Sequence, residues 1–510
     1  MHSSSLILLG IAFAAAASSR TIAVQPDVSG TVPAEQVMVL APVGTQRPPF
    51  QFTKDDEQFL TEVQRGAFNY LWNQVAPKTG MVRDRTSGTV VSVAGVGFQL
   101  SALPVGVERG WVTRDDAQAR AKLILSSLAA NPANRKAGLF YHYLDGELAG
   151  PTNESYERAV STIDSALLFA GIITASSYFG GDIRDLGDKL LADADWTFFV
   201  ATDDARIHKG PPRDYERGFI SLAWTPDVQE RPTGDGKLAP YYWVDSGDEH
   251  RLVAFLAVCA PNPAHRLAPE TYYRLRRELG SYRDTGVFAW FPYSGALFTY
   301  FFAHCWIDYG SLGPDNPGAL GVANRPRVDW WENSRRAVRM HQLKAIENPA
   351  RVPTLGENAW GLTASDSPKG YAVPGLYPTR IPTLGERPGF DYAVFNAKDD
   401  YGDGTVAPYG AGCAILFDPT RAVAALRYYR DLKRADGTSL VWQDPASGGI
   451  GFRDAFNLGT DWSAPDCVAI DQGPLILAIE NARTGLVWKL FQDHPTIRGG
   501  MTRLGLAQRP

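Results

Sequence analysis

Three acidic residues stand at the starts of apolar segments long enough to be helices: Asp164, Glu249 and Asp471. A carboxylate at the mouth of a buried helix costs free energy unless it is paired or used in chemistry. For Asp164 a second explanation weighs equally. Ser161 lies three residues before it, as in a capping box, and an acid in the first turn favours the helix dipole. We therefore treat all three acids as candidate catalytic residues and keep helix capping open for Asp164.

Pairs of carboxyl groups are typical of enzymes that hydrolyse glycosidic bonds. One carboxyl protonates the leaving oxygen, and the other activates water or attacks the sugar directly. Glu249 follows a segment that contains Tyr242 and Trp243, whose flat rings suit the faces of sugars. We expect both aromatic residues to bind substrate. An acid-rich helix start is the alternative explanation for this cluster.

Four further residues lie outside these motifs in polar or aromatic surroundings. They are Asp308, Arg335, Trp360 and Asp403. Each is a candidate for binding sugar hydroxyls, and each could equally order a loop.

The sequence argues against several other classes of protein. Its eight histidines are scattered without a ligand spacing such as HxxxH, so we expect no metal. The GxSxG and P-loop motifs are absent, and we expect no cofactor. With 50 Lys and Arg against 55 Asp and Glu, and no basic run, nucleic acid is not an expected partner.

The composition is that of a large globular protein. Of 510 residues, 45% are apolar and 21% charged, which excludes disorder for most of the chain. Aromatic residues reach 11%, which suits a sugar-binding cleft or the filling of a large core.

Apolar residues recur at helical spacing in a series of segments. These are 54–75, 92–108, 114–129, 162–179, 183–200, 248–259, 269–279, 296–306, 329–346, 419–433 and 472–491. Residues 350–418 are rich in Gly, Pro, Asp and Tyr, and we expect a long functional loop without a helix there. We predict one all-α domain, an (α/α)6 toroid or barrel with long active-site loops. A superhelical stack of helix pairs is the alternative, although no fixed repeat period is present.

The N-terminal segment has the features of an export signal. Residues 6–17 are apolar but too short to span a bilayer, and small residues follow them. We predict a signal peptide at 1–23, a Pro-rich linker at 24–50 and a glycoside hydrolase domain at 51–510. The expected localisation is periplasmic or secreted, with no membrane span, and the expected state is a monomer.

Four cysteines are present: Cys259, Cys305, Cys413 and Cys467. None lies in a CxxC pair. In an exported protein they could form disulfides, and in a large core they could equally remain buried thiols.

Several motifs, in order along the chain, resemble those of the bacterial glucoamylase-like family that includes the endo-β-1,2-glucanases. They include GMVRDR at 80–85, VERGW at 107–111, GLFYH at 138–142, STIDSALL at 161–168, WGLTASD at 360–366, GY at 370–371, DGTVAP at 403–408, GFRDAFN at 451–457 and IDQGP at 470–474. The resemblance implies an (α/α)6 barrel. It also implies a secreted or periplasmic glycoside hydrolase that acts on β-1,2-glucan and releases sophoro-oligosaccharides.

The resemblance also implies roles for the acids. Glu249 matches the general acid by position, and inversion implies Asp471 or Asp164 as the partner that activates water. Gly247 stands where relatives have a tyrosine, and Ala159-Val160 stand where relatives often carry a glutamate. These departures leave open an exo-acting enzyme or another linkage, a polysaccharide lyase, and a non-catalytic glycan-binding protein.

Overall fold

The computed structural model describes residues 36–152, 158–202, 216–226, 236–382 and 398–509. The predicted signal peptide lies outside these residues. Within them the chain forms 13 α-helices. They are α2 (Lys54–Asn73), α3 (Val93–Glu108), α4 (Arg114–Ala130), α5 (Thr162–Phe179), α6 (Gly181–Asp193), α7 (Asp248–Cys259), α8 (Glu270–Arg274), α9 (Trp330–Glu347), α10 (Pro408–Cys413), α11 (Pro419–Asp431), α12 (Ala469–Arg483), α13 (Leu486–Gln492) and α14 (Pro495–Leu504).

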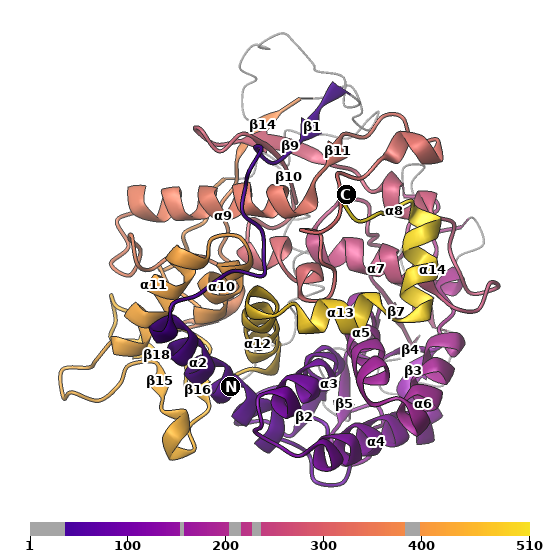
Figure 1. Ribbon diagram of the computed structural model, residues 1–510, viewed down its shortest axis with the longest axis horizontal. Helices are drawn as coiled ribbons and strands as arrows, with labels where there is room; N and C mark the ends of the chain where they lie inside the picture. The colour runs from indigo at the N-terminus through magenta and orange to yellow at the C-terminus, as the bar shows by residue number, and fades with distance from the viewer. Residues whose placement is uncertain (1–35, 153–157, 203–215, 227–235, 383–397, 510) are drawn as a thin grey trace.

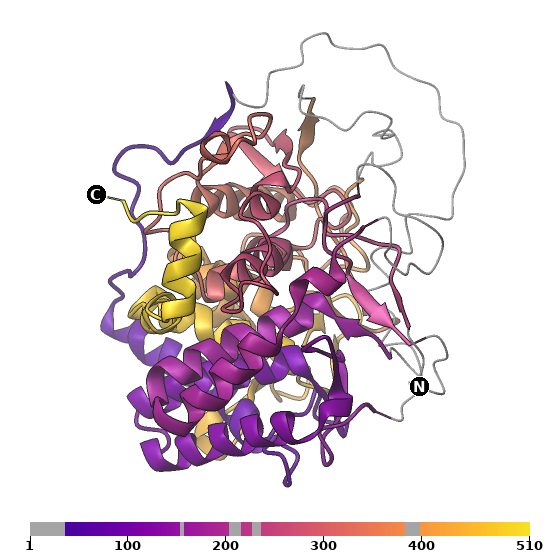
Figure 2. The ribbon, with the colours of Figure 1, turned by 90° about the vertical axis from the view of Figure 1, so that its right-hand side faces the viewer.

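Two kinds of helix build an α-helical barrel (Figures 1 and 2). Helices α3 and α5 are apolar on all sides and almost wholly buried, as inner helices must be. Helices α2, α6, α9 and α11 each have one apolar and one polar face, which suits an outer layer. Helix α3 packs against α5 and α12, α5 packs against α7, and α12 packs against α10. The helical class predicted from the sequence is confirmed.

The crossing of α3 and α5 depends on two glycines. A Cβ atom on Gly97 would lie 2.2 Å from the Leu167 carbonyl oxygen, and one on Gly171 would lie 2.0 Å from the Gly97 carbonyl oxygen. The two backbones are therefore in direct contact. This contact fixes where α5 begins relative to α3.

Helix α5 is long and apolar enough to cross a membrane, by length and composition alone. However, 89% of its apolar window is buried inside the barrel. Burial on this scale is that of a core helix.

Eighteen short strands form eight small sheets in the described loops. The two-stranded sheets are β1 (Met38–Val39) with β11 (Arg327–Val328), β2 (Val90–Ser92) with β5 (Tyr143–Asp145), β3 (Arg135–Lys136) with β4 (Leu139–Phe140), β12 (Ser365–Ser367) with β13 (Gly370–Ala372), β15 (Trp442–Gln443) with β16 (Gly451–Phe452) and β17 (Phe456–Asn457) with β18 (Trp462–Ser463). The three-stranded sheets are β6 (Val160–Ser161), β7 (Ala223–Thr225), β8 (Lys237–Leu238) and β10 (Val287–Trp290), β9 (Glu278–Ser281), β14 (Thr379–Ile381). Only the β1–β11 pair is parallel among these strands.

Residues 296–306 form two short 3-10 turns instead of the expected helix. The amides of Ala303 and His304 donate to the carboxylate of Asp248, which lies outside the segment. These amides therefore do not continue an α-helical ladder, and the prediction was wrong here.

Four further expectations differ from the structure. The helix expected at 183–200 ends at Asp193 and is followed by a 3-10 turn at Trp196–Phe199, and the segment expected at 472–491 is divided between α12 and α13. The helix expected at 269–279 ends at Arg274, and strand β9 begins at Glu278. The stretch 350–418, expected to lack a helix, contains α10. Pro408 opens α10 at a position where its missing N–H costs nothing, so its presence did not exclude a helix.

The described part of the predicted linker, residues 36–50, lies along the domain. Strand β1 pairs with β11, and Arg47 donates to Asp329 over 2.8 Å.

All four cysteines are buried free thiols. Of the two alternatives considered from the sequence, disulfides and buried thiols, the structure has the buried thiols.

Candidate active site

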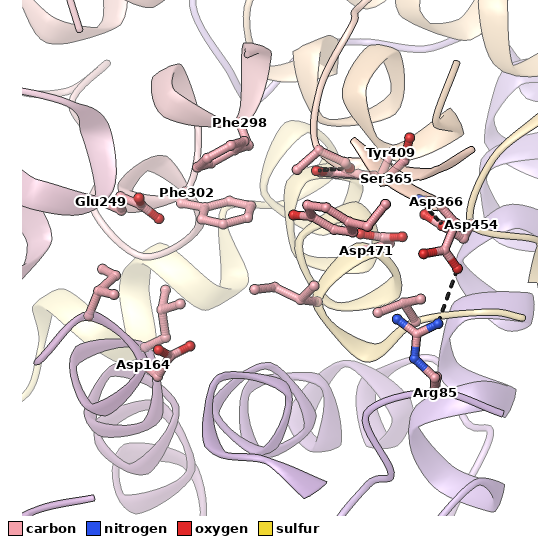
Figure 3. A pocket seen from close by; sticks show the side chains of 16 residues that line it. Arg85, Asp164, Glu249, Phe298, Phe302, Ser365, Asp366, Tyr409, Asp454 and Asp471 are labelled. Atoms are coloured by element: carbon pink, nitrogen blue, oxygen red, sulfur yellow. Dashed lines mark hydrogen bonds and ion pairs between the residues drawn. The ribbon is translucent and has the colours of Figure 1, made fainter. Parts of the chain in front are cut away.

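Side chains from distant parts of the sequence surround one hollow, here named the acidic cavity (Figure 3). It encloses about 590 Å³ of space, part of it open to solvent. Sixteen residues line it: Arg85, Ile163, Asp164, Leu167, Glu249, Phe298, Phe302, Ala364, Ser365, Asp366, Tyr371, Tyr409, Asp454, Val468, Ile470 and Asp471. The three acids selected from the sequence as catalytic candidates are all among them.

Asp164 is the third residue of α5 and serves both as a helix cap and as part of the cavity wall. Ser161 accepts a hydrogen bond from the Asp164 amide at 3.3 Å, and the Ser161 hydroxyl donates to Asp164 Oδ2. The other oxygen, Oδ1, lies 3.5 Å from His142 Nε2 and has no hydrogen-bond partner among the described residues. Helix capping and a place in the candidate site, the two explanations for Asp164 that the sequence left open, are therefore compatible.

Glu249 is the second residue of α7 and is only 4% exposed. Its Oε1 lies 3.5 Å from His250 Nε2. Figure 3 shows its carboxyl on the side of the cavity where Phe298 and Phe302 also lie, with Asp164 on the neighbouring helix. An acid in this setting faces an apolar aromatic wall.

Asp471, the third residue of α12, forms a side-chain hydrogen bond with Asp454 on the other side of the cavity. Burial raises the pKa of Asp454 to about 7. Burial, and then the charge of Asp454, raise the pKa of Asp471 well above its ordinary value. Both carboxyls therefore bind a proton more tightly than an exposed aspartate does. Asp471 Oδ2 is buried without a hydrogen-bond partner among the described residues, so it is available to a ligand.

Arg85 is the cation of this wall. Its guanidinium lies 3.1 Å from Asp366 Oδ2, 3.5 Å from Asp466 Oδ2 and 3.6 Å from Asp84 Oδ2. The amide of Asp366 in turn donates to Asp454 Oδ2 over 2.7 Å. One cation thus orders several carboxylates, which act as hydrogen-bond acceptors.

Two tyrosines complete this side of the cavity. Burial raises the pKa values of Tyr371 and Tyr409 well above their ordinary value. Both phenols therefore stay protonated at neutral pH and can donate hydrogen bonds. The Tyr409 hydroxyl donates to the Ala364 carbonyl over 2.9 Å.

The two aromatic candidates near Glu249, Tyr242 and Trp243, are not among the residues that line the cavity. Trp243 Nε1 donates to Thr162 Oγ1 over 2.8 Å, and its ring stacks on His250. Burial raises the pKa of Tyr242 to about 12. Trp243 therefore packs against His250, the residue that follows Glu249.

Arg335 and Trp360 also lie away from the lining residues. Arg335 binds Glu332 on the same helix, α9, through Nε at 2.7 Å. Trp360 is 1% exposed and belongs to the core.

Asp308 and Asp403 order the turns in which they lie. Asp308 Oδ1 accepts from the Ser311 amide at 3.0 Å, and Asp403 Oδ1 accepts from the Thr405 hydroxyl at 2.6 Å. Sugar binding by these four residues, as by Tyr242 and Trp243, stays a prediction.

Several lining residues were not selected from the sequence. Arg85, Asp366, Tyr371 and Asp454 come from loops and short strands, where helical periodicity carries no information. All four lie within motifs that carried the family resemblance, at 80–85, 360–366, 370–371 and 451–457. Motif membership was therefore the one available indication.

Among the described residues, no group of three or more His, Cys, Asp or Glu side chains could hold a metal ion.

Comparison with known proteins identifies the family. The family model named Glycoamylase and described as "Putative glucoamylase" matches residues 240–495, which is half of the chain. The chain belongs to the glucoamylase-like family. The matched range holds Glu249, Asp454 and Asp471, whereas Arg85 and Asp164 precede it.

One curated relative of this glucoamylase-like chain is an exo beta-1,2-glucooligosaccharide sophorohydrolase (non-reducing end) from Parabacteroides distasonis. The two are 27% identical over 477 residues, which cover 88% of this chain and 58% of the relative. The chain thus spans less than two thirds of the relative's length.

Two solved structures share the fold. A "putative glucoamylase" from Bacteroides uniformis is 26% identical, with a TM-score of 0.68, and the match covers 90% of this chain and 99% of that one. An endo-beta-1,2-glucanase from Chitinophaga pinensis, in complex with sophorotriose and glucose, is 22% identical. Its TM-score is also 0.68, with the same coverage of both chains.

Proposed function

We propose that this glucoamylase-like protein is a glycoside hydrolase that cleaves β-1,2-linked glucan. The observation that carries the proposal is the meeting of Glu249 and Asp164, from the starts of two neighbouring inner helices, in one cavity with an aromatic wall. Hydrolysis of a glycosidic bond needs two such carboxyls. The named activities of the relatives from Parabacteroides and Chitinophaga support the β-1,2 linkage.

In this proposal Glu249 is the general acid. It protonates the glycosidic oxygen as the bond from that oxygen to the sugar carbon breaks. The proton moves from Glu249 to the leaving sugar, and the carboxylate left behind regains a proton from solvent. The apolar rings of Phe298 and Phe302 limit access of water to this acid.

Asp164 is the base in this proposal, and the mechanism inverts the anomeric carbon. A base must be ionised, and burial raises the pKa of both members of the Asp454–Asp471 pair, which disfavours their ionised forms. Asp164 therefore activates the attacking water, while Asp471 Oδ2 and Asp454 bind sugar hydroxyls. A pair of carboxyls that shares one proton can both donate to and accept from a hydroxyl.

The finer parts of the proposal concern cleavage mode and architecture. We propose endo cleavage to sophoro-oligosaccharides, with exo cleavage as the alternative. We also propose an (α/α)6 barrel, in which α3, α5, α7, α10 and α12 are inner helices and the 3-10 turns within 297–305 take the sixth place. Packing of α7 and α12 against these turns supports this arrangement.

The remaining parts concern the cell and the assembly. We propose export to the periplasm or medium, on the strength of the apolar segment at 6–17, and a monomer in solution. N-terminal sequencing of the exported protein and its mass in solution test these two points.

The experiment is an assay of new reducing ends on linear β-1,2-glucan, with β-1,3-glucan, β-1,4-glucan and starch in parallel. We expect cleavage of β-1,2-glucan alone, with product chain lengths that separate endo from exo action. Cleavage of another glucan in preference would overturn the linkage. Absence of cleavage with saturable glycan binding would favour a binding protein instead.

A further inference from the structure

The imidazole of His250 lies directly beside the carboxyl of Glu249. His250 Nε2 is 3.5 Å from Glu249 Oε1, and the histidine is 1% exposed. This distance is longer than an ordinary hydrogen bond, but contacts at active sites often tighten only when substrate binds. A role for this contact rests on the proposed function, in which Glu249 is the acid.

Two aromatic rings fix the orientation of the imidazole. It lies nearly flat against Trp243, with ring centroids 4.2 Å apart and an angle of 26° between the planes. The ring of Phe291 meets it at 70°, also at 4.2 Å. Trp243 is itself held by its hydrogen bond to Thr162, the first residue of α5. The imidazole cannot turn without moving these rings, so Nε2 stays directed at Glu249.

The other ring nitrogen, Nδ1, has a backbone partner in either tautomer. It lies 3.1 Å from the Gly247 amide nitrogen and 3.1 Å from the Asp245 carbonyl oxygen. With a proton on Nδ1, the ring donates to Asp245, and the bare Nε2 can accept from a protonated Glu249. With a proton on Nε2, the ring accepts from Gly247 and can donate to an ionised Glu249. The acid therefore has a suitable partner in both of its forms.

Gly247 provides the space for this ring. A Cβ atom at position 247 would lie 2.8 Å from His250 Nδ1 and 2.9 Å from Cε1. A side chain there would push the imidazole out of its place. Gly247 is thus the residue that admits the ring beside the acid.

We propose that His250 is a positioning residue for the catalytic acid: it holds the carboxyl of Glu249 in the orientation that protonates the leaving oxygen. The transferred proton is that of Glu249, and no bond forms to His250. Gly247 and Trp243 act through the ring, one by leaving it room and the other by supporting its face.

Three substitutions test this role on linear β-1,2-glucan, with kcat, KM and the melting temperature measured for each. His250→Phe keeps a flat ring and removes both nitrogens. We expect kcat to fall about 10- to 100-fold with KM within about threefold, because a misplaced acid slows the chemical step more than binding. His250→Gln, which keeps polar atoms near Glu249, should regain part of the loss. Gly247→Ala, which moves the ring and leaves it intact, should lower kcat with KM little changed.

The matched control is His341→Phe, at another buried histidine, on α9 and outside the acidic cavity. It should keep kcat within about twofold. A folded His250→Phe enzyme with wild-type kcat, or a loss expressed only in KM, would overturn the role of His250. If His250→Phe does not fold, a wild-type kcat for Gly247→Ala would overturn it.

A Glu249→Gln enzyme assayed alongside separates the two proposals. Full activity in Glu249→Gln would overturn the proposed function itself. An inactive Glu249→Gln beside a fully active His250→Phe would overturn only the positioning role.

Discussion

The carboxyl groups of Asp454 and Asp471 are hydrogen bonded to each other in the wall of the acidic cavity. Asp454 also accepts from the backbone of Asp366, whose side chain binds Arg85. Because burial raises both pKa values, the ionised form that a base needs is disfavoured in this pair. This pairing distinguishes Asp471 from Asp164, the two residues that the sequence analysis gave as alternative partners of Glu249 for activating water.

The first prediction compares those two aspartates. Asp164→Asn removes the proposed base and should lower kcat by about 10²- to 10⁴-fold. Asp471→Asn replaces the carboxyl that is hydrogen bonded to Asp454 by an amide of the same size and should mainly raise KM, with kcat within about tenfold. Steady-state kinetics on β-1,2-glucan give both values. The reverse order, with kcat lost in Asp471→Asn and kept in Asp164→Asn, would assign the base to Asp471.

The second prediction concerns stability and pH. Burial raises the pKa of Asp454 to about 7 from the ordinary 3.8, so the folded state binds this proton more tightly than the unfolded chain. The corresponding stability is fully present below about pH 4 and is lost as pH rises through about 7. Asp454→Asn stays neutral throughout. The melting temperature of the wild type minus that of Asp454→Asn should therefore be lower at pH 8 than at pH 5, and a constant difference would contradict the raised pKa.

The same pair of residues shows how far sequence reasoning reached. Asp471 was selected because it opens an apolar helix, and Asp164 and Glu249 were found in the same way. Helical periodicity locates such residues because an inner helix must be apolar on all sides. The structure places all three in one cavity.

Asp454 was beyond that reasoning, because it lies in a loop between short strands and its position depends on contacts with Asp366 and Asp471. The aromatic residues show a second limit of sequence reasoning. Trp243 and Trp360 were chosen as substrate-binding residues, and both are buried, which composition alone does not indicate. Sugar binding by either residue stays a prediction. The helix predicted at 296–306 was wrong for a comparable reason. The amides of Ala303 and His304 donate hydrogen bonds to the side chain of Asp248, and the sequence does not indicate this distant contact.

The third prediction concerns the crossing of α3 and α5. Gly171→Ala places a Cβ atom within 2.0 Å of the Gly97 carbonyl oxygen, so one helix must shift. We expect a loss of about 1–3 kcal/mol in the free energy of unfolding, measured in urea. Gly356→Ala, where a Cβ atom meets nothing within 4 Å, is the control and should change it by less than about 0.5 kcal/mol. Equal stability of the two variants would contradict direct backbone contact.

The fourth prediction concerns the cysteines. All four thiols are buried and free, and burial raises the pKa of Cys467 to about 12 and of Cys305 well above its ordinary value. A thiol reagent at neutral pH should therefore react slowly with the native protein and label all four thiols after denaturation. An intact mass short of two hydrogens per pair would instead indicate a disulfide.

The central claim is that Glu249 protonates the leaving sugar during cleavage of β-1,2-glucan. The most direct measurement is the rate of new reducing ends from linear β-1,2-glucan for the wild type and for Glu249→Gln, with the melting temperatures of both as the control for folding. We predict a loss of at least about 10²-fold in kcat for a variant that remains folded. A folded Glu249→Gln protein that cleaves the glucan at the wild-type rate would contradict the assignment of the acid.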